Sequence, residues 1–557
     1  MNYRNIVGLL TLLLSISATS PISGEVRRSD TIKLRSPLDI PLYLAGNFGE
    51  LRRSHFHSGI DFKTQGRTGF PVHSVADGYV SRATVSPWGF GRAVYVTHPS
   101  SGITTVYGHL EAFSPEIDRR VRNLQYEKET FTIDVSFEPD EIPVKNGDII
   151  GSSGNAGSSG GPHVHFDVRD TKTGNALDPL EYYRTRIKDD VKPEVRQVIL
   201  FPAPGGTVEG KESIGSYRQP SGNLTFHAHG PVIPAIKAYD RMSGTQNIYG
   251  IKYLTLLLDS DTIYRRVIDE SPFESTRAIH TLVNNRDLAK DNAWVMWTYI
   301  PPSAPLGKMV WAENRGILTV DSGKTYDMTW LLEDEHGNIT RQPFKIIGDN
   351  QIAASPIASG QLMLWNCDNL LEDEKIIVEV PEGTLYDNEF IDLKRRKSPN
   401  YLSEVITVGD PAIATANSFE LSIAIDNDTV VDKQKYCLVR INGSRRSAES
   451  ATYSDGWLDA RPSTFGTYAV TVDTVPPKII PIAKERWKST GVIKFKITDE
   501  LSGIQSWRGE IDGKFALFEL DGKTSTLSFK IDPERFPGKD HKVTLTVTDA
   551  CGNIENY

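Results

Sequence analysis

Seven of the twelve histidines in this 557-residue sequence lie between positions 55 and 165, so any histidine chemistry belongs to its N-terminal third. His57 precedes Asp61 by four positions, and His163 precedes His165 by two. In an extended chain both spacings place the side chains on one face. Two imidazoles and one carboxylate would give a catalytic Zn²⁺ three ligands and leave a fourth position open for water.

Taken separately, neither motif is specific. A His-x-x-x-Asp spacing often arises by chance, and His-x-His pairs occur without any metal. His227-Ala-His229 is such a pair, and because it has no carboxylate partner nearby we interpret it as a surface feature. The metal hypothesis therefore depends on what surrounds the two motifs.

The surrounding sequence predicts short β-strands joined by glycine-rich turns. Runs such as 93–96 and 103–107 are rich in β-branched and aromatic residues, which favour strands. No long segment shows a convincing helical periodicity. We therefore expect residues 36–185 to form one mostly antiparallel β domain.

Both histidine motifs lie among residues that resemble the lysostaphin/LytM family of zinc metallopeptidases, which cut bacterial cell-wall peptides. The resemblance covers roughly residues 38–185, about a quarter of the chain, and its motifs occur in family order. They are His55-Phe-His57-Ser-Gly59-Ile-Asp61, Ala76-Asp-Gly78, Tyr107-Gly-His109-Leu110, Gly147-Asp-Ile-Ile-Gly151-Ser-Ser-Gly154 and Gly161-Pro-His163-Val-His165-Phe166.

The resemblance implies that His57, Asp61 and His165 bind one Zn²⁺, while His109 and His163 face the substrate and the reacting water. Zinc lowers the pKa of bound water to about 7, but a proton must still be moved. No His-Glu-x-x-His motif supplies a glutamate base, so an imidazole is the fitting candidate. We favour His163 as the base and His109 as the oxyanion-stabilising group, and the reverse assignment stays open.

Other residues near these motifs receive structural interpretations. His55, His73 and His98 match no ligand position of the family, and we expect polar surface or strand-end roles for them. Asp167 continues the face of His163 and His165, so it could orient a ligand, although we expect a solvated strand residue. The glycines between 151 and 161 are expected to let the backbone approach the substrate.

Between Leu110 and Ile142 the chain has roughly twenty residues more than the compact family pattern. Apolar and polar residues alternate from Phe131 to Glu138, which predicts an amphipathic strand. This strand could wall the substrate groove or extend the sheet.

The C-terminal part of the chain contains an internal repeat. Asp240-Arg-Met-Ser-Gly244 matches Asp499-Glu-Leu-Ser-Gly503, and Asp334-Glu-His-Gly-Asn338 matches Asp549-Ala-Cys-Gly-Asn553. Asp and Gly at these positions favour tight turns after strands, so we expect two related β-sandwich modules, at 190–350 and 474–557. Strand-like runs in 351–473 predict a third β domain, and the whole protein is expected to be mostly β.

Composition and the N-terminus indicate an exported protein that folds. With 39% apolar and 24% charged residues and a net charge of −9, a disordered chain or a nucleic-acid-binding protein is not expected. The 13-residue apolar run from Ile6 to Ala18 is too short to span a bilayer, so residues 1–24 are interpreted as a signal peptide cleaved after Ala18 or Gly24. No cysteine lies there, which argues against a lipid anchor.

Only three cysteines occur in the whole chain, which is no disulfide framework. Cys367 and Cys437 could pair and leave Cys551 free, or all three could be buried thiols.

The leading hypothesis is an exported zinc endopeptidase that hydrolyses peptide cross-links of peptidoglycan, in the periplasm or cell envelope or after release. Its C-terminal β modules would then target it or bind an envelope partner. The alternatives are an inactive relative that binds cell wall or activates hydrolases, and an envelope adhesion or assembly protein. Because the modules contain no catalytic motif, residues 36–185 are expected to fold and cleave substrate alone.

Overall fold

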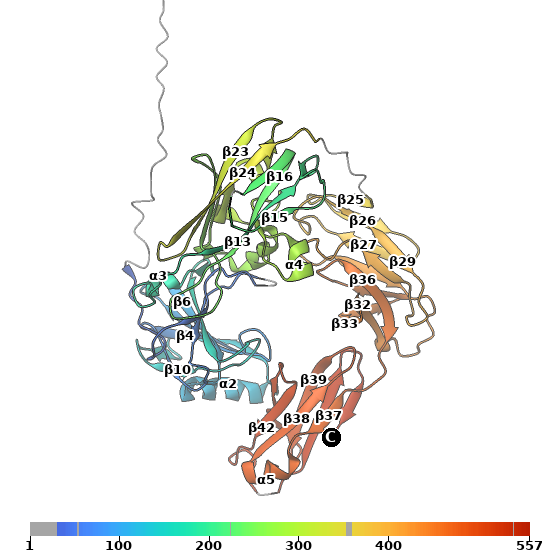
Figure 1. Ribbon diagram of the computed structural model, residues 1–557. Coiled ribbons are helices and arrows are strands. Elements are labelled where there is room, and N and C mark those ends of the chain that lie inside the picture. The colour runs from blue at the N-terminus through green and yellow to red at the C-terminus, as the bar shows by residue number, and fades with distance from the viewer. Residues whose placement is uncertain (1–30, 53–54, 223, 352–358, 539) are drawn as a thin grey trace, which may run out of the picture.

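The computed structural model describes residues 31–52, 55–222, 224–351, 359–538 and 540–557, and the expected signal peptide at 1–24 lies outside them. The fold is mostly β, as expected, with strands grouped in four successive regions of the chain (Figure 1). Among the helices in the described residues, none has the length and apolar character that crossing a membrane requires.

The N-terminal domain is an antiparallel sheet whose strand order is β1-β2-β11-β6-β5-β4-β8, with a small second sheet, β3-β10-β7. Its elements are β1 (Leu44–Gly46), β2 (Ile60–Lys63), β3 (Pro71–His73), β4 (Gly78–Val85), β5 (Arg92–His98), β6 (Ile103–Leu110), β7 (Ala112–Phe113), α2 (Pro115–Glu127), β8 (Ile133–Ser136), β9 (Pro143–Val144), β10 (Ile149–Ser152), β11 (His163–Asp170), β12 (Ala176–Leu177) and α3 (Leu180–Tyr183).

Strand β11 shows why this sheet can carry a polar site. Alternate side chains of a strand point to opposite faces. Val164, Phe166 and Val168 belong to the apolar core, and the residues between them, His163, His165 and Asp167, therefore share the other face. One strand thus supplies both part of the core and part of the polar site.

The expected insertion contains a helix as well as the expected strand. Helix α2 begins with Pro115 after Ser114 and buries Ile117, Val121 and Gln125 at four-residue spacing. A 13-residue helix thus forms where the sequence shows no convincing helical periodicity, because only two of its three buried residues are apolar. Strand β8 pairs with β4, so the amphipathic strand extends the sheet and does not wall the groove.

The next region, residues 194–348, is built around the 15-residue strand β16. This strand pairs antiparallel with β13 along 232–239 and parallel with β24 along 225–228. The elements are β13 (Glu194–Pro202), β14 (Thr207–Val208), β15 (Ser216–Arg218), β16 (Thr225–Tyr239), β17 (Tyr253–Leu258), β18 (Asp261–Val267), β19 (Glu270–Ser271), η1 (Phe273–Thr281), α4 (Asn285–Asp291), β20 (Met296–Trp297), η2 (Gly307–Met309), β21 (Val310–Ala312), η3 (Glu313–Gly316), β22 (Leu318–Val320), β23 (Thr325–Glu333) and β24 (Ile339–Gly348).

This second region shares its core with the N-terminal domain. Strand β12 of the first domain pairs with β19 of the second. A single apolar cluster runs through both and includes Phe48, Phe56 and Ile268. The Asn47 side chain donates to the Gly250 carbonyl and accepts from its amide, both at 2.9 Å. The two regions therefore form one packed unit.

Two further sandwiches complete the chain. The third region contains two five-stranded sheets, with strand orders β26-β27-β31-β35-β34 and β29-β30-β36-β32-β33, and the two-stranded sheet β25-β28. The fourth region contains two four-stranded sheets, with strand orders β37-β38-β42-β41 and β40-β39-β43-β44. The third contains β25 (Gln361–Met363), β26 (Asn369–Glu372), β27 (Ile376–Val380), β28 (Glu389–Ile391), β29 (Leu393–Arg396), β30 (Val405–Val408), β31 (Glu420–Ala424), η4 (Lys433–Lys435), β32 (Tyr436–Asn442), β33 (Arg445–Glu449), β34 (Ala451–Ser454), β35 (Trp457–Ala460) and β36 (Gly466–Val472). The fourth contains β37 (Lys478–Pro481), η5 (Lys484–Arg486), α5 (Trp487–Thr490), β38 (Val492–Thr498), β39 (Ile504–Ile511), β40 (Lys514–Ala516), β41 (Glu519–Asp521), β42 (Thr526–Lys530), β43 (Val543–Asp549) and β44 (Ile554–Asn556).

The chain curves so that the fourth region returns to the first, beside α2 (Figure 1). Arg508 donates to Glu129 at 2.6 Å. The Arg535 guanidinium lies over the Tyr126 ring, 3.9 Å from its centre. The insertion that the sequence predicted as a departure from the family thus forms a docking surface inside the protein.

The cysteines are arranged differently from the pairing considered above. Cys437 and Cys551 are both buried in one small apolar cluster, although they belong to the third and fourth regions. Cys367 is partly exposed and lies near Asn369. Pairing of Cys367 with Cys437 is therefore wrong, and the thiols are free.

The shared core predicts that the first domain depends on the second. A chain ending at residue 190 loses the partner of β12 and part of the cover of Phe48 and Phe56. Each buried aromatic or aliphatic side chain contributes roughly 1.5–3 kcal/mol. We expect this chain to unfold at a lower temperature than one ending at residue 350, as measured by circular dichroism. Equal unfolding temperatures would show that residues 36–185 are self-sufficient.

Candidate metal centre and its groove

Three donor atoms converge at one point of the main sheet. Pairing of β2 with β11 places Asp61 opposite His165, and His57 reaches them from the loop before β2. The distances His57 Nε2–Asp61 Oδ1, His57 Nε2–His165 Nδ1 and His165 Nδ1–Asp61 Oδ1 are all 3.0 Å. Ligands at 2.0–2.1 Å around a tetrahedral zinc ion are about 3.3 Å apart, so this donor set fits zinc with little movement.

The second polar atom of each donor residue is held by another group. His57 donates from Nδ1 to the Asn47 carbonyl at 2.7 Å, and Arg52 donates to Asp61 Oδ2 at 2.6 Å. His165 Nε2 lies 2.6 Å from Asp167 Oδ1. Such outer contacts fix the tautomer and orientation of metal-binding side chains. Each residue therefore has one nitrogen or oxygen left for the metal.

Asp167 is fully buried, which contradicts the expected solvated strand residue. Its carboxylate also accepts from Ser58 at 3.0 Å and from Arg169. Burial opposes ionisation, but His165 and Arg169 outweigh it and hold the pKa of Asp167 well below the usual value. The orienting role that the sequence left as an alternative is the one that the contacts support.

The ligand imidazoles differ in their proton affinity. Burial lowers the pKa of His57 to about 4, so its ring is neutral at pH 7. Burial acts in the same direction on His165, but Asp167 outweighs it and raises the pKa of His165 to about 9. A metal ion must therefore compete with a proton at His165, which makes occupancy of the site depend on pH.

His109 and His163 lie beside the donor atoms, with ring centres 4.6 Å apart. Each has its Nδ1 within 2.8 Å of a backbone carbonyl, that of Ala156 for His109 and that of Gly161 for His163. Because a carbonyl can only accept, both neutral rings carry their proton on Nδ1 and present an Nε2 lone pair. His163 Nε2 is buried without a hydrogen-bond partner, 3.4 Å from Asp61 Oδ1.

The surroundings make His109 a poor proton acceptor at neutral pH. Burial, and then the charges that His163 and His165 can carry, lower the pKa of His109 to about 3. The residue also has a positive φ of 59°, a conformation that is uncommon outside glycine. His109 is thus a neutral imidazole at pH 7, on a backbone conformation that few residues other than glycine adopt.

A groove next to His163 takes residues from two regions of the chain. Gly160, Gly161 and Lys63 line it together with Asn247 of the second region. Asn247 accepts from Lys63 Nζ at 2.6 Å. A side chain at Gly160 or Gly161 would meet open space, and close approach of this backbone to the substrate stays a prediction.

The fourth region reaches the opposite side of the centre. Gly522, in the turn after β41, lies against Trp88, and Lys523 donates to the carbonyl of Asn155. Asn155 immediately precedes Ala156, whose carbonyl holds His109. Loops of two C-terminal regions therefore border the site.

Five further histidines that the sequence assigned to structural or surface roles lie outside the centre. His73 contacts the Gly147 carbonyl at 2.8 Å, and His98 at the end of β5 is buried between Asp77 and Thr105. His55 is exposed, and so is His227 on β16, whereas His229 is half-buried. None of these five belongs to the donor set.

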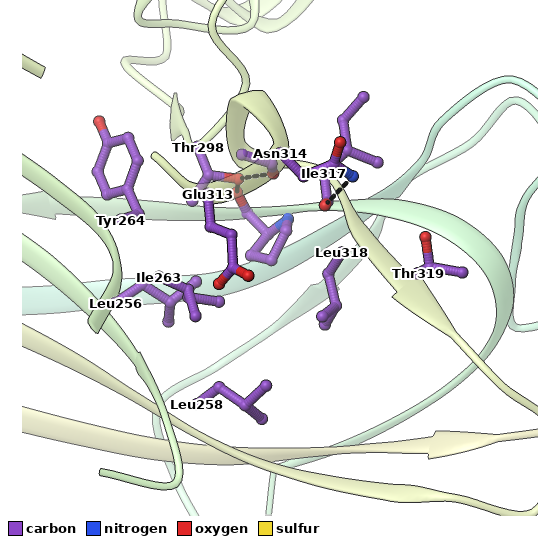
Figure 2. Close-up of a pocket in the computed structure, with 12 residues that line it drawn as sticks. Leu256, Leu258, Ile263, Tyr264, Thr298, Glu313, Asn314, Ile317, Leu318 and Thr319 are labelled. Carbon is purple, nitrogen blue, oxygen red and sulfur yellow. Dashed lines mark hydrogen bonds between the residues drawn. The ribbon is translucent and has the colours of Figure 1, made fainter. Parts of the chain in front are cut away.

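A separate cavity lies within the second region (Figure 2). Leu256, Leu258, Ile263 and Leu318 surround it, and Glu313 is its only ionisable lining residue apart from Tyr264. This lining offers no set of metal ligands and lies apart from the histidine centre.

Sequence reasoning named the five residues that the structure brings together but missed the side chains that hold them. Asn47, Ser58 and Arg52 follow no spacing pattern, and their contacts depend on how loops close over the sheet. Asp167 was visible as part of the alternating face of β11.

Comparison with known proteins agrees with the motif reading. Residues 55–126 match the family model described as peptidase family M23, and residues 360–473 match a Zu5-like domain. Over 113 residues the chain is 32% identical to the DD-carboxypeptidase/endopeptidase Mpg of Neisseria meningitidis, a stretch that covers 20% of each chain. The chain thus spans about a fifth of the length of the curated relatives it matches.

Two solved structures are also similar. The catalytic domain of the prophage-encoded M23 protein EnpA from Enterococcus faecalis is 25% identical, with 25% of this chain and 89% of that chain covered and a TM-score of 0.19. A zinc-containing peptidase from Vibrio cholerae is 25% identical, with 26% and 37% covered and a TM-score of 0.19. From the family match and the curated relatives we conclude that this chain carries a peptidase family M23 domain in its N-terminal region, followed further along by a Zu5-like domain.

Proposed function

We propose that this protein is an exported zinc-dependent endopeptidase that hydrolyses peptide cross-links of peptidoglycan. The observation that carries the proposal is the convergence of three donor atoms at 3.0 Å beside two further imidazoles. The relative named DD-carboxypeptidase/endopeptidase supports a peptide substrate of this class. The filled set of five positions favours catalysis over the inactive cell-wall-binding alternative.

His163 and His109 have different proposed roles at the scissile peptide bond. When bound, Zn²⁺ would supply acidified water and a Lewis acid for the carbonyl. His163 keeps its Nδ1 proton on the Gly161 carbonyl, so its Nε2 can take a proton from the water and return it to the leaving amine. His109, a poor acceptor at pH 7, can donate to a developing oxyanion only after it has gained a proton itself.

The C-terminal regions have a different proposed role. They would position the enzyme on the envelope or bind a partner, and the loops at Asn247 and Lys523 would limit which peptides enter the groove. Extended cross-links between two stem peptides fit a site that is bordered from two sides.

The ligand assignment predicts coupled loss of metal and activity. The purified protein should hold about one Zn²⁺ per chain. His57→Ala, Asp61→Ala and His165→Ala should each lower zinc content, measured by elemental analysis, together with cleavage of cell-wall material. His227→Ala, at an exposed histidine, is the matched control and should keep both. Full zinc content in all three ligand variants would refute the assignment.

The roles of His163 and His109 predict loss of turnover without loss of metal. His163→Ala and His109→Ala should retain zinc and lose at least about 10²-fold in kcat, the low end for a positioned acid-base group. Unchanged turnover in both variants would contradict the proposed machinery.

Asp167 is predicted to act as a positioning residue. Asp167→Asn removes the charge that holds the His165 ring, and loss of such a contact typically lowers metal affinity 10–100-fold. Competition with a chelator would measure the zinc Kd directly. Asp134→Asn, at an exposed position on β8, is the control. Equal zinc affinity of wild type and Asp167→Asn would mean that Asp167 serves only to pack the sheet.

A further inference from the structure

The repeated motifs of the C-terminal part bring aspartates together in space. In the second region Asp189, Asp240 and Asp334 form what we call the first aspartate cluster, and in the fourth region Asp473, Asp499 and Asp549 form the second. Within each cluster the three carboxylates offer oxygen atoms that all lie within 4.8 Å of one another. Four of these aspartates are the ones that define the sequence repeat, and the structure adds Asp189 and Asp473.

Both clusters are built in the same way. The aspartate that precedes the module accepts from a serine amide in the first repeat loop, Ser243 to Asp189 at 2.9 Å and Ser502 to Asp473 at 3.0 Å. An asparagine in the second loop donates to the main-chain carbonyl of that aspartate, at 3.1 Å for Asn338 and 3.0 Å for Asn553. Each cluster thus joins the start of a module to two of its loops.

The first cluster contains buried oxygens without a partner. Asp189, Asp240 and Asp334 are only 6, 4 and 4% exposed. Asp189 Oδ2 and Asp240 Oδ1 are buried and accept no hydrogen bond. The three residues line one small cavity, together with Phe48 of the N-terminal domain and Met242. Buried polar atoms in native proteins normally have partners, so two unpaired carboxylate oxygens facing one cavity indicate a missing ligand.

The missing ligand must be positive. Among the described residues, no lysine or arginine forms an ion pair with the first cluster. Lys252 lines the same cavity, but its ammonium group bonds Asp178 at 2.8 Å and also Glu335. Burial, together with the charges of Asp334 and Asp189, raises the pKa of Asp240 to about 8. Three buried carboxylates at this spacing are costly without a cation.

The donors that the two clusters share select the kind of cation. His336 lines the first cavity, but the corresponding position of the second repeat is Cys551, so only the carboxylates are common to both. Oxygen-only ligand sets favour calcium, which accepts irregular geometry, over zinc or the strictly octahedral magnesium. We propose that the first aspartate cluster is a calcium site, which holds one Ca²⁺ between the linker and two loops of its module.

Calcium at the first cluster would act on the joint between module and catalytic domain. Asp240 exchanges backbone hydrogen bonds with Tyr249. The next residue, Gly250, is held by the Asn47 side chain, and the Asn47 carbonyl accepts from His57. A cation that fixes the Asp240 loop therefore stiffens a short chain of contacts that ends at a ligand of the metal centre.

Equilibrium dialysis of the full-length, zinc-saturated protein against millimolar calcium tests the proposal, because extracellular modules bind calcium in this range. We expect one calcium ion per chain in the wild type and none in Asp240→Asn. Asp190→Asn, at the exposed neighbour of Asp189, should still bind one. No binding by the wild type, or equal binding by all variants, would overturn the proposal.

Thermal unfolding with and without calcium distinguishes a variant that has lost the calcium site from one that binds less calcium because it is poorly folded. Without calcium, Asp240→Asn should unfold at the same or a higher temperature than wild type, since it removes a buried carboxyl group whose Oδ1 has no hydrogen-bond partner. With calcium the order should reverse, because only the wild type gains the calcium site. An Asp240→Asn variant that is less stable in both conditions, by the same amount, would contradict a calcium site. Calcium binding and unfolding temperature are both measured without the peptidase reaction, so their outcome is independent of the proposed peptidase activity.

Discussion

The pairing of β2 with β11 is the constraint on which the candidate metal centre depends, because it sets Asp61 opposite His165. Ile60 and Phe62 on β2, and Val164 and Phe166 on β11, pack into the core from the other face of the same two strands. A slip by one residue would turn the carboxylate into the core and an apolar side chain into the site. The apolar residues therefore fix the register, and the register fixes the ligand geometry.

A buried cluster of imidazoles and carboxylates also needs outer support, and that support extends beyond the M23 domain. Asp167 and Arg169 hold His165 from within the sheet. Asn47 holds His57, while its own side chain is tied to Gly250 of the second region. The electrostatics of the centre and the packing between regions are thus parts of one structure, in which a loop from a module without catalytic residues helps to orient a ligand.

The sequence could predict what depends on local pattern. His57, Asp61 and His165 follow from spacing and the family resemblance, and the mostly β fold follows from alternating apolar residues. Contacts between distant segments could not be predicted. Arg52 and Asn47 carry no pattern, α2 shows too few apolar residues to reveal its period, and Asp189 and Asp473 join their clusters only through folding. The repeat motifs were visible, but their aspartates were interpreted as turn residues, because the order of residues in a sequence does not show which distant side chains meet in the fold.

The pairing of β12 with β19 has a consequence for how the protein is made. Strand β12 ends at Leu177, and its partner begins at Glu270, so the edge of the catalytic sheet stays open while the residues between them are synthesised. At about 5–20 residues per second this interval lasts roughly 5–20 s. During that time the nascent chain exposes an unpaired edge and part of the shared apolar cluster, which makes this stretch the one where a chaperone has most to protect.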